Sequence, residues 1–500
     1  MKNRHAVLLI GLFPALTYAQ FGRGGGDWMT AGSDAQRSSW VRTDAKISPA
    51  SLLKGGFDIT FKIAADPSAR ESLAAPLTLN SYIGYRGFRS LVFLGATADK
   101  VIGVDTDLGR VEWRRELPVS GASPCASAAV AITRPTTAAF PGQPGGRGFG
   151  PRGGAAKSGV GQPLEGAVTI REIAANMPGP GGPPPGRANT VRGANAGRGP
   201  LPGFGRMPSI LDVVGRDGML HSIYVSNGEG PNPPLRFVPA NTRLIGLMNV
   251  DNVVYAAAGQ GCDAAPGELV ALDLESKQLA AFRPDSGAIA GTDGFAMGPD
   301  GTVYAATTGG DLIALEPKTL QRKQTYRAGQ PFATSPVLFQ HGEQTWIAAA
   351  TQDGRIHVLD AAALSTPLAS SAATGSPVRS LATWQDPSGG RWILGPAAGA
   401  VVAWKVADTN DGATLQPGWT SRDLTAPLAP IVVNGVVFTA STGASPVLYA
   451  LDGATGQELW NSGRKIGSAI RGGGLSAGNS QVFLSTSDGT FYAFGFPIEH

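Results

Sequence analysis

The sequence contains little cysteine, histidine or charge. Of its 500 residues, two are cysteines and five are histidines, and only 16% are charged. There is no Cys-x-x-Cys-His sequence to attach a haem covalently, and the histidines lack the spacing of a zinc site. In an oxidising compartment Cys125 and Cys262 could form one disulfide, but sequence does not fix the distance between them, so their pairing stays open. These shortages exclude c-type cytochromes and the common zinc enzymes.

Long hydrophobic runs are also missing. The strongest apolar stretch, Ala6 to Leu16, follows a basic start and precedes the small-residue stretch Thr17 to Ala19. This order is typical of a secretory signal, and the apolar part is too short to span a bilayer. We therefore expect residues 1–19 to be a signal peptide and the mature protein to be periplasmic or secreted. No cysteine near residue 19 would carry a lipid anchor, and no later run predicts a transmembrane segment.

The most informative feature is a phrase that recurs along the chain. Its clearest copy, from Ala450 to Trp460, contains Ala-x-Asp, then Thr-Gly, then Trp, and a close copy runs from Gly103 to Trp113. From Ser226 onwards the equivalent positions are 43 to 47 residues apart. They are Asp105, Ser226, Asp273, Glu316, Asp360, Lys405, Asp452 and Gly495. This interval is the period of a four-stranded propeller blade, so eight positions predict an all-β, eight-bladed β-propeller with antiparallel blades.

The residues of the phrase have structural roles in this interpretation. Short apolar runs rich in small residues, such as Val253 to Ala258, precede the repeats and are predicted to be inner strands near a central channel. We expect each Asp to accept N–H groups of a turn, each Gly to adopt positive φ, and each Trp to dock on the next blade. The residues concerned are Asp105, Gly109, Trp113, Asp273, Asp360, Asp452, Thr455, Gly456 and Trp460.

One long interval in the repeat is explained by an insertion. Residues 135–208 are rich in Gly, Pro and Arg. Between Arg134 and Arg206 there are nine basic and two acidic residues, a net charge of +7 in a chain of net charge +4. Such a segment buries too little apolar surface to offset its ordering entropy, so we predict a disordered insertion within a single propeller domain, residues 20–500. Arg-Gly segments can bind RNA, but an exported protein meets little of it, so no nucleic-acid partner is expected.

Two segments resemble a known family. The phrase from Ala450 to Trp460 resembles the tryptophan-docking motif of the pyrroloquinoline-quinone (PQQ) repeat family, and the runs Asp27 to Arg37 and Ile47 to Leu52 resemble the opening of quinoprotein dehydrogenases. The resemblance covers nearly all of the expected mature chain except the insertion. It implies a ring closed by an N-terminal strand around Phe57 to Ile63, which would complete the last blade beside Val482 to Phe496.

The resemblance implies two alternative functions. In the dehydrogenases PQQ and calcium lie at the channel mouth, a carboxylate acts as base, and two adjacent cysteines form a disulfide over the cofactor. In the other branch, an outer-membrane assembly factor, the propeller is a scaffold without cofactor. Here Ala126 follows Cys125 where the enzymes carry their cysteine pair, so that disulfide cannot form. Were PQQ bound, Cys125, Arg134 and Gln260 would be the candidate cofactor contacts and Asp263 the candidate base, yet no dense group of carboxylates would hold calcium and no metal ligand is predicted.

Three hypotheses follow. The favoured one is a non-catalytic exported propeller that binds an envelope protein or a small-molecule ligand at its channel mouth, because the cysteine pair is absent and carboxylates are sparse. The alternative is a divergent PQQ-dependent alcohol or sugar dehydrogenase, with Arg134 and Asp263 near the cofactor. The third is a polymer or glycan binder that uses exposed side chains of the least regular blades, namely Trp384, Trp392, Trp404 and Arg379, although packing between blades would equally explain these tryptophans.

Overall fold

The structure is a computed structural model. It describes residues 26–66, 75–84, 87–96, 100–118, 131–133, 135–136, 210–258, 267–409, 412–470 and 474–497. These residues form one short helix, α1 (Pro49–Lys54), and 34 strands. No helix within these ranges is long and apolar enough to cross a membrane.

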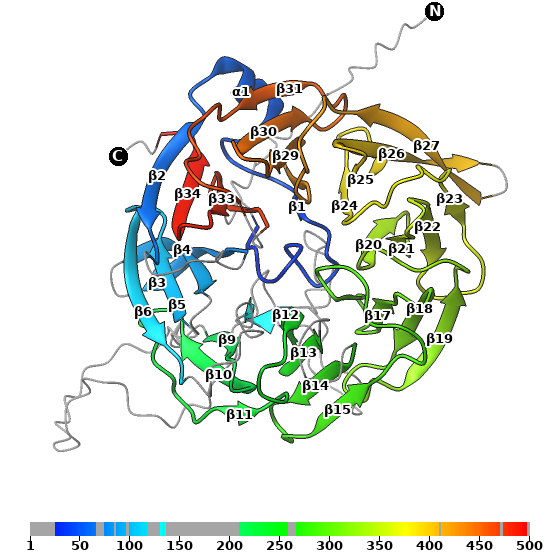
Figure 1. Ribbon diagram of the computed structural model, residues 1–500, viewed down its shortest axis with the longest axis horizontal. Coiled ribbons are helices and arrows are strands. Elements are labelled where there is room, and N and C mark those ends of the chain that lie inside the picture. Colours follow the sequence, from blue (N-terminus) through cyan, green and yellow to red (C-terminus); the bar gives the residue numbers. More distant parts are fainter. Residues whose placement is uncertain are drawn as a thin grey trace, which may run out of the picture.

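The strands form eight sheets arranged as blades around a central axis (Figure 1). From the axis outwards, blade one contains β3 (Leu77–Gly84), β4 (Gly87–Ala96), β5 (Lys100–Asp105) and β6 (Arg110–Glu116). Blade two contains β7 (Ala131–Thr133), β9 (Ile210–Val214), β10 (Met219–Tyr224) and β11 (Leu235–Arg236). Blade three contains β12 (Leu244–Val250), β13 (Val253–Ala258), β14 (Leu269–Asp273) and β15 (Leu279–Phe282), with β8 (Pro135–Thr136) parallel to β12. Blade four contains β16 (Phe295–Met297), β17 (Val303–Ala306), β18 (Asp311–Leu315) and β19 (Arg322–Arg327).

The second half of the ring follows the same order. Blade five contains β20 (Val337–His341), β21 (Gln344–Ala350), β22 (Ile356–Asp360) and β23 (Ala369–Ser370). Blade six contains β24 (Ala382–Gln385), β25 (Arg391–Ala397), β26 (Ala400–Thr409) and β27 (Gly412–Thr420). Blade seven contains β28 (Ile431–Val433), β29 (Val436–Ser441), β30 (Val447–Asp452) and β31 (Glu458–Asn461), with β1 (Trp40–Val41) parallel to β28. Blade eight contains β32 (Ser476–Gly478), β33 (Gln481–Ser485), β34 (Thr490–Gly495) and β2 (Asp58–Ala64).

The N-terminal strand closes the ring. Strand β2 pairs antiparallel with β34, with Phe61 opposite Ala493 and Ile63 opposite Phe491. The last blade is thus built from both ends of the chain, which leaves no unpaired edge at the junction. The eight-bladed, all-β architecture and its closure by an N-terminal strand confirm the fold predicted from the repeat.

The apolar runs found in the sequence form the second strand of each blade. All six residues of β13 are buried, as are all six of β29. These runs were predicted to be the strands nearest the channel, but each is the second strand of its blade, because one more strand lies between it and the axis. Both faces of these second strands pack against neighbouring blades, which explains why they lack the alternation of polar and apolar residues seen in half-exposed strands. Their small side chains let adjacent sheets approach each other.

The repeated position marks the end of the third strand. Strands β5, β14, β22 and β30 end at Asp105, Asp273, Asp360 and Asp452. Blade six is the exception, since Lys405 lies in the middle of β26 and the hairpin to β27 is longer than its equivalents. The hydrophobic core consists of clusters between neighbouring blades, such as the one that joins Tyr255 of blade three to Phe295 of blade four.

Candidate functional site

The repeat motif ties each blade to the next through its turn. In blade one, the Asp105 carboxylate Oδ1 accepts the backbone N–H groups of Asp107 and Leu108, both at 3.0 Å. The indole Nε1 of Trp113 donates to the carbonyl oxygen of Val225 in blade two at 2.9 Å. A Cβ added at Gly228, in the same turn of blade two, would lie 2.6 Å from the Trp113 ring. The indole therefore packs against the backbone of this turn at a position where any side chain larger than that of glycine would clash with it.

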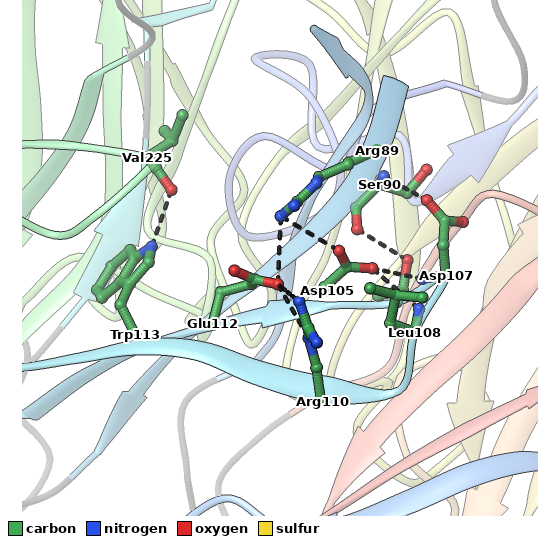
Figure 2. Close-up of polar contacts among 10 residues, drawn as sticks. Arg89, Ser90, Asp105, Asp107, Leu108, Arg110, Glu112, Trp113 and Val225 are labelled. Atoms are coloured by element: carbon green, nitrogen blue, oxygen red, sulfur yellow. Dashed lines mark hydrogen bonds and ion pairs between the residues drawn. The ribbon is translucent and has the colours of Figure 1, made fainter. Parts of the chain in front are cut away.

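A polar network accompanies this contact on blade one (Figure 2). The Arg89 guanidinium lies 3.4 Å from Asp105 and 3.2 Å from Glu112, and Arg110 pairs with Glu112 at 3.0 Å. Arg110 and Arg89 lower the pKa of Glu112, although partial burial acts against them. The carboxylates of Asp105 and Glu112 are thus paired with arginines of the same blade. We interpret this network as a structural support for the turn rather than a site of acid–base chemistry.

The same contact recurs where the sequence motif did not reveal it. Trp419 on β27 donates its Nε1 to the Gly453 carbonyl of blade seven at 2.9 Å. In the sequence Trp419 follows Lys405 by 14 residues, whereas Trp113 follows Asp105 by eight. The longer β26–β27 hairpin accounts for this offset, and a search for Trp at variable distance from the third strand would have found it. In blade seven, Trp460 lies edge-on to Phe57, with ring centroids 4.9 Å apart, just before the closing strand.

The axis of the ring is crossed by the chain's own N-terminal segment, residues 28–41, which we call the axial segment (Figure 1). Its backbone forms hydrogen bonds with the innermost strands of several blades. In each of these hydrogen bonds a strand residue donates its backbone N–H to a carbonyl oxygen of the axial segment. The bonds run from Thr78 to Trp28, from Met297 to Ala35, from Leu338 to Gln36, from Thr383 to Ser38 and from Val432 to Ser39. These partners lie in blades one, four, five, six and seven, so a short segment fastens most of the ring together.

Arg37 anchors the axial segment in blades three and four. Its side chain is 1% exposed. Its guanidinium donates to the carbonyl oxygens of Phe295 at 2.7 Å and Gly246 at 2.8 Å, and within its own segment to Thr30 Oγ1 at 2.7 Å and the Ala31 carbonyl at 2.5 Å. Burial lowers its pKa to about 10, and the negative charges of Asp293 and Asp34 oppose that change. The buried cation is thus satisfied mainly by carbonyl dipoles.

The carboxylates near the axis do not assemble a calcium site. Burial raises the pKa of both Asp34 and Asp293. The oxygens of Asp34 are used within the segment, since they accept the Ser38 amide at 2.9 Å and the Ser38 hydroxyl at 2.5 Å. Across the described ranges, no group of three or more His, Cys, Asp or Glu side chains could share a metal ion. Calcium sites are built from six or more oxygen ligands, many of them carboxylates, and Asp34 and Asp293 alone do not supply such a set.

None of the residues proposed for cofactor contact is among those that the structure describes. Cys125, Arg134, Gln260 and Asp263 are outside the described residues, as is Cys262. The insertion proposed for residues 135–208 also lies outside them, apart from β8 at its start. The glycan-binding interpretation of the tryptophans is wrong, because Trp384, Trp392 and Trp404 are 3%, 7% and 4% exposed. They pack between blades five, six and seven, while Arg379 alone of that set is exposed.

Comparison with known proteins places this architecture among propellers. The solved structure of quinohemoprotein alcohol dehydrogenase from Comamonas testosteroni is similar with a TM-score of 0.57 at 12% identity, over 95% of this chain and 81% of that one. The quinohemoprotein alcohol dehydrogenase ADHIIG from Pseudomonas putida HK5 gives a TM-score of 0.53 at 11% identity, over 95% and 82%. BamB from Moraxella catarrhalis gives 0.48 at 12% identity, over 86% and 99%. No curated protein sequence matches the chain.

The class of protein follows from the fold and the repeat together. At such low identity the structural similarity shows the shared propeller fold alone. The sequence itself matches the PQQ-like repeat family described as outer membrane protein assembly factor BamB, over residues 265–495. This match runs from the third strand of blade three to the end of β34. The chain is an eight-bladed β-propeller, and its residues 265–495 match the PQQ-like repeat family.

Proposed function

We propose that this protein is a non-catalytic binding or scaffold propeller of the cell envelope. The observation that carries the proposal is the axial segment. Residues 28–41 are bonded to the innermost strands of five blades through backbone carbonyl groups, and Arg37 adds side-chain bonds to blades three and four. The centre of the ring, where the dehydrogenases would hold their cofactor, is here crossed by a buried segment that is hydrogen-bonded to the surrounding blades.

The repeat family adds support from an independent direction. Its description is that of an outer membrane protein assembly factor, and its match runs from the third strand of blade three to β34 of blade eight. The apparent secretory signal at residues 1–19 agrees with such a location. An envelope protein is therefore the partner we propose, in the periplasm or outside the cell, and the rim turns of the ring are the surfaces on which it would bind.

A titration with PQQ and calcium tests this proposal against the dehydrogenase alternative. The purified chain is mixed with increasing PQQ at saturating calcium, and absorbance and melting temperature are recorded. A ligand at a hundredfold excess over its dissociation constant stabilises the folded state by about 2.7 kcal/mol, which is easily seen in the melting temperature. We expect no saturable change. Tight binding that depends on calcium would reject the scaffold proposal in favour of an oxidoreductase.

A further inference from the structure

Two arginines flank one tryptophan at the end of the axial segment. Trp40 begins β1, Arg42 follows that strand, and Arg391 begins β25 of blade six. The guanidinium carbon of Arg42 lies 4.1 Å from the centre of the Trp40 ring, and that of Arg391 lies 5.5 Å from it. Arg391 also lies 5.5 Å from the centre of the Phe339 ring in blade five. Aromatic rings thus hold both cations in fixed positions where blades five, six and seven meet.

Arg391 is a buried cation that has no counter-charge among the described residues. The residue is 5% exposed, and its guanidinium donates one hydrogen bond, from Nη2 to the Gln340 carbonyl at 2.8 Å. Within the described ranges no carboxylate lies at ion-pair distance from it. Burial lowers its pKa to about 10, and its charged neighbour Arg42 lowers it further. Buried charges are normally paired, because removing an ion from water costs several kcal/mol.

The same place collects buried N–H donors that lack an acceptor. Trp40 Nε1, Arg42 Nε and Arg391 Nε are all inaccessible to solvent and have no hydrogen-bond partner among the described residues. Most buried side-chain donors in proteins do have a partner. Arg37, five residues before Arg42, shows the contrast, since its Nε and both Nη atoms all donate to protein oxygens.

The nearest acid does not supply the missing acceptor. Asp34 attracts Arg42 electrostatically, but no ion pair joins them, and both Asp34 oxygens already accept hydrogen bonds from Ser38. Two positive charges and three unpartnered donors therefore lie on or beside the Trp40 ring, and no carboxylate among the described residues pairs with either arginine. Arg42 is partly exposed, so a small ligand can approach from its side.

We propose that Trp40, Arg42 and Arg391 form a binding site for a small oxyanion carrying two negative charges. Guanidinium groups bind phosphate and carboxylate oxygens through charge-assisted hydrogen bonds, and the indole N–H supplies a further donor. Hydrogen phosphate and a short dicarboxylate both have this chemistry. The site is independent of the envelope role proposed above, and of any PQQ or calcium binding.

Equilibrium dialysis with radiolabelled inorganic phosphate tests the site directly, with malonate as the competing dicarboxylate. Chloride at matched ionic strength controls for general salt effects. We expect saturable binding of one anion per chain, which is displaced by malonate and not by chloride. The dialysis is repeated with radiolabelled malonate, and if malonate binds and phosphate does not, the natural ligand is a carboxylate. If neither binds saturably, the proposal is wrong.

Matched variants locate the bound anion. Arg42→Met and Arg391→Lys should each weaken anion binding at least tenfold. The first removes a positive charge, and the second keeps the charge but removes the planar guanidinium group that can donate two parallel hydrogen bonds. Arg327→Met removes the same charge from a side chain that is 85% exposed, and should leave affinity unchanged. Near-ultraviolet circular dichroism confirms that each variant is folded. Unchanged affinity in both Arg42→Met and Arg391→Lys would place the anion elsewhere and overturn the assignment.

Discussion

The ring of Trp419 in blade six lies directly on Gly456 in blade seven. A Cβ added at Gly456 would come within 2.4 Å of the ring, and Gly456 has a φ of 73°. The glycine of the Thr-Gly step is therefore required for two reasons. It adopts the left-handed backbone conformation of the turn, and it leaves room for the neighbouring indole. One residue type satisfies both requirements.

Replacing Gly456 with Ala should destabilise the protein by about 2–4 kcal/mol, as the sum of positive-φ strain and overpacking against Trp419. The matched control is Gly329→Ala, because Gly329 also has a φ of 73° but has nothing within 4 Å of the added Cβ. That variant should lose only about 1 kcal/mol. Urea unfolding measures both, and equal losses would show that the indole contact does not matter.

The Trp113 indole should contribute through both packing and its hydrogen bond. Trp113→Ala removes the ring between blades one and two and should cost about 3–5 kcal/mol. Trp113→Phe keeps an aromatic ring but leaves the Val225 carbonyl without its donor, which should cost about 1 kcal/mol for the hydrogen bond, plus some packing. Thermal unfolding of the two variants and the wild type measures the two losses of stability. A Phe variant as unstable as the Ala variant would contradict this division.

Arg37→Met should loosen the axial segment as well as lower stability. The change removes the donor from four oxygens, three of them in buried contacts, and we expect a loss of about 3–5 kcal/mol. Hydrogen exchange should accelerate at the amides of Met297, Leu338 and Thr383, since each donates to that segment. Arg327→Met, on the surface, should change stability by less than about 0.5 kcal/mol. Unaltered exchange at these amides in Arg37→Met would mean that Arg37 does not hold the segment.

The buried His357 should make stability fall in mild acid. Burial lowers its pKa, and the hydroxyl of Tyr326 lies 3.0 Å from its Nδ1. Because the folded state resists protonation, the unfolded chain binds the proton first as pH falls through the ordinary histidine value near about 6.5. Stability is then lost until pH drops below the folded-state pKa.

The measurement is the melting temperature of wild type and His357→Gln between about pH 7.5 and about pH 5. Other groups contribute equally to both proteins, so the difference between the two curves isolates His357. We expect the wild type to lose more stability than the variant over this range. Parallel curves would show that His357 titrates alike in the folded and unfolded states.

The ring could be predicted from sequence because its repeat is local. Each Asp and each Thr-Gly step is determined by a turn within one hairpin, and the spacing then counts the blades. The contacts of the axial segment could not be predicted, since Arg37 finds its partners Gly246 and Phe295 more than 200 residues away. Trp419 was missed because a longer hairpin shifts it out of register. Trp384, Trp392 and Trp404 were ambiguous because packing and surface binding select the same residue type.

The most direct test of the whole account is turnover. The purified chain, supplied with PQQ, calcium and an artificial electron acceptor, is incubated with a panel of primary alcohols and sugars, beside a quinohemoprotein alcohol dehydrogenase as positive control. A binding or scaffold propeller predicts no reduction of the acceptor above the rate without protein. PQQ-dependent oxidation of any of these substrates would contradict it and identify the chain as an oxidoreductase.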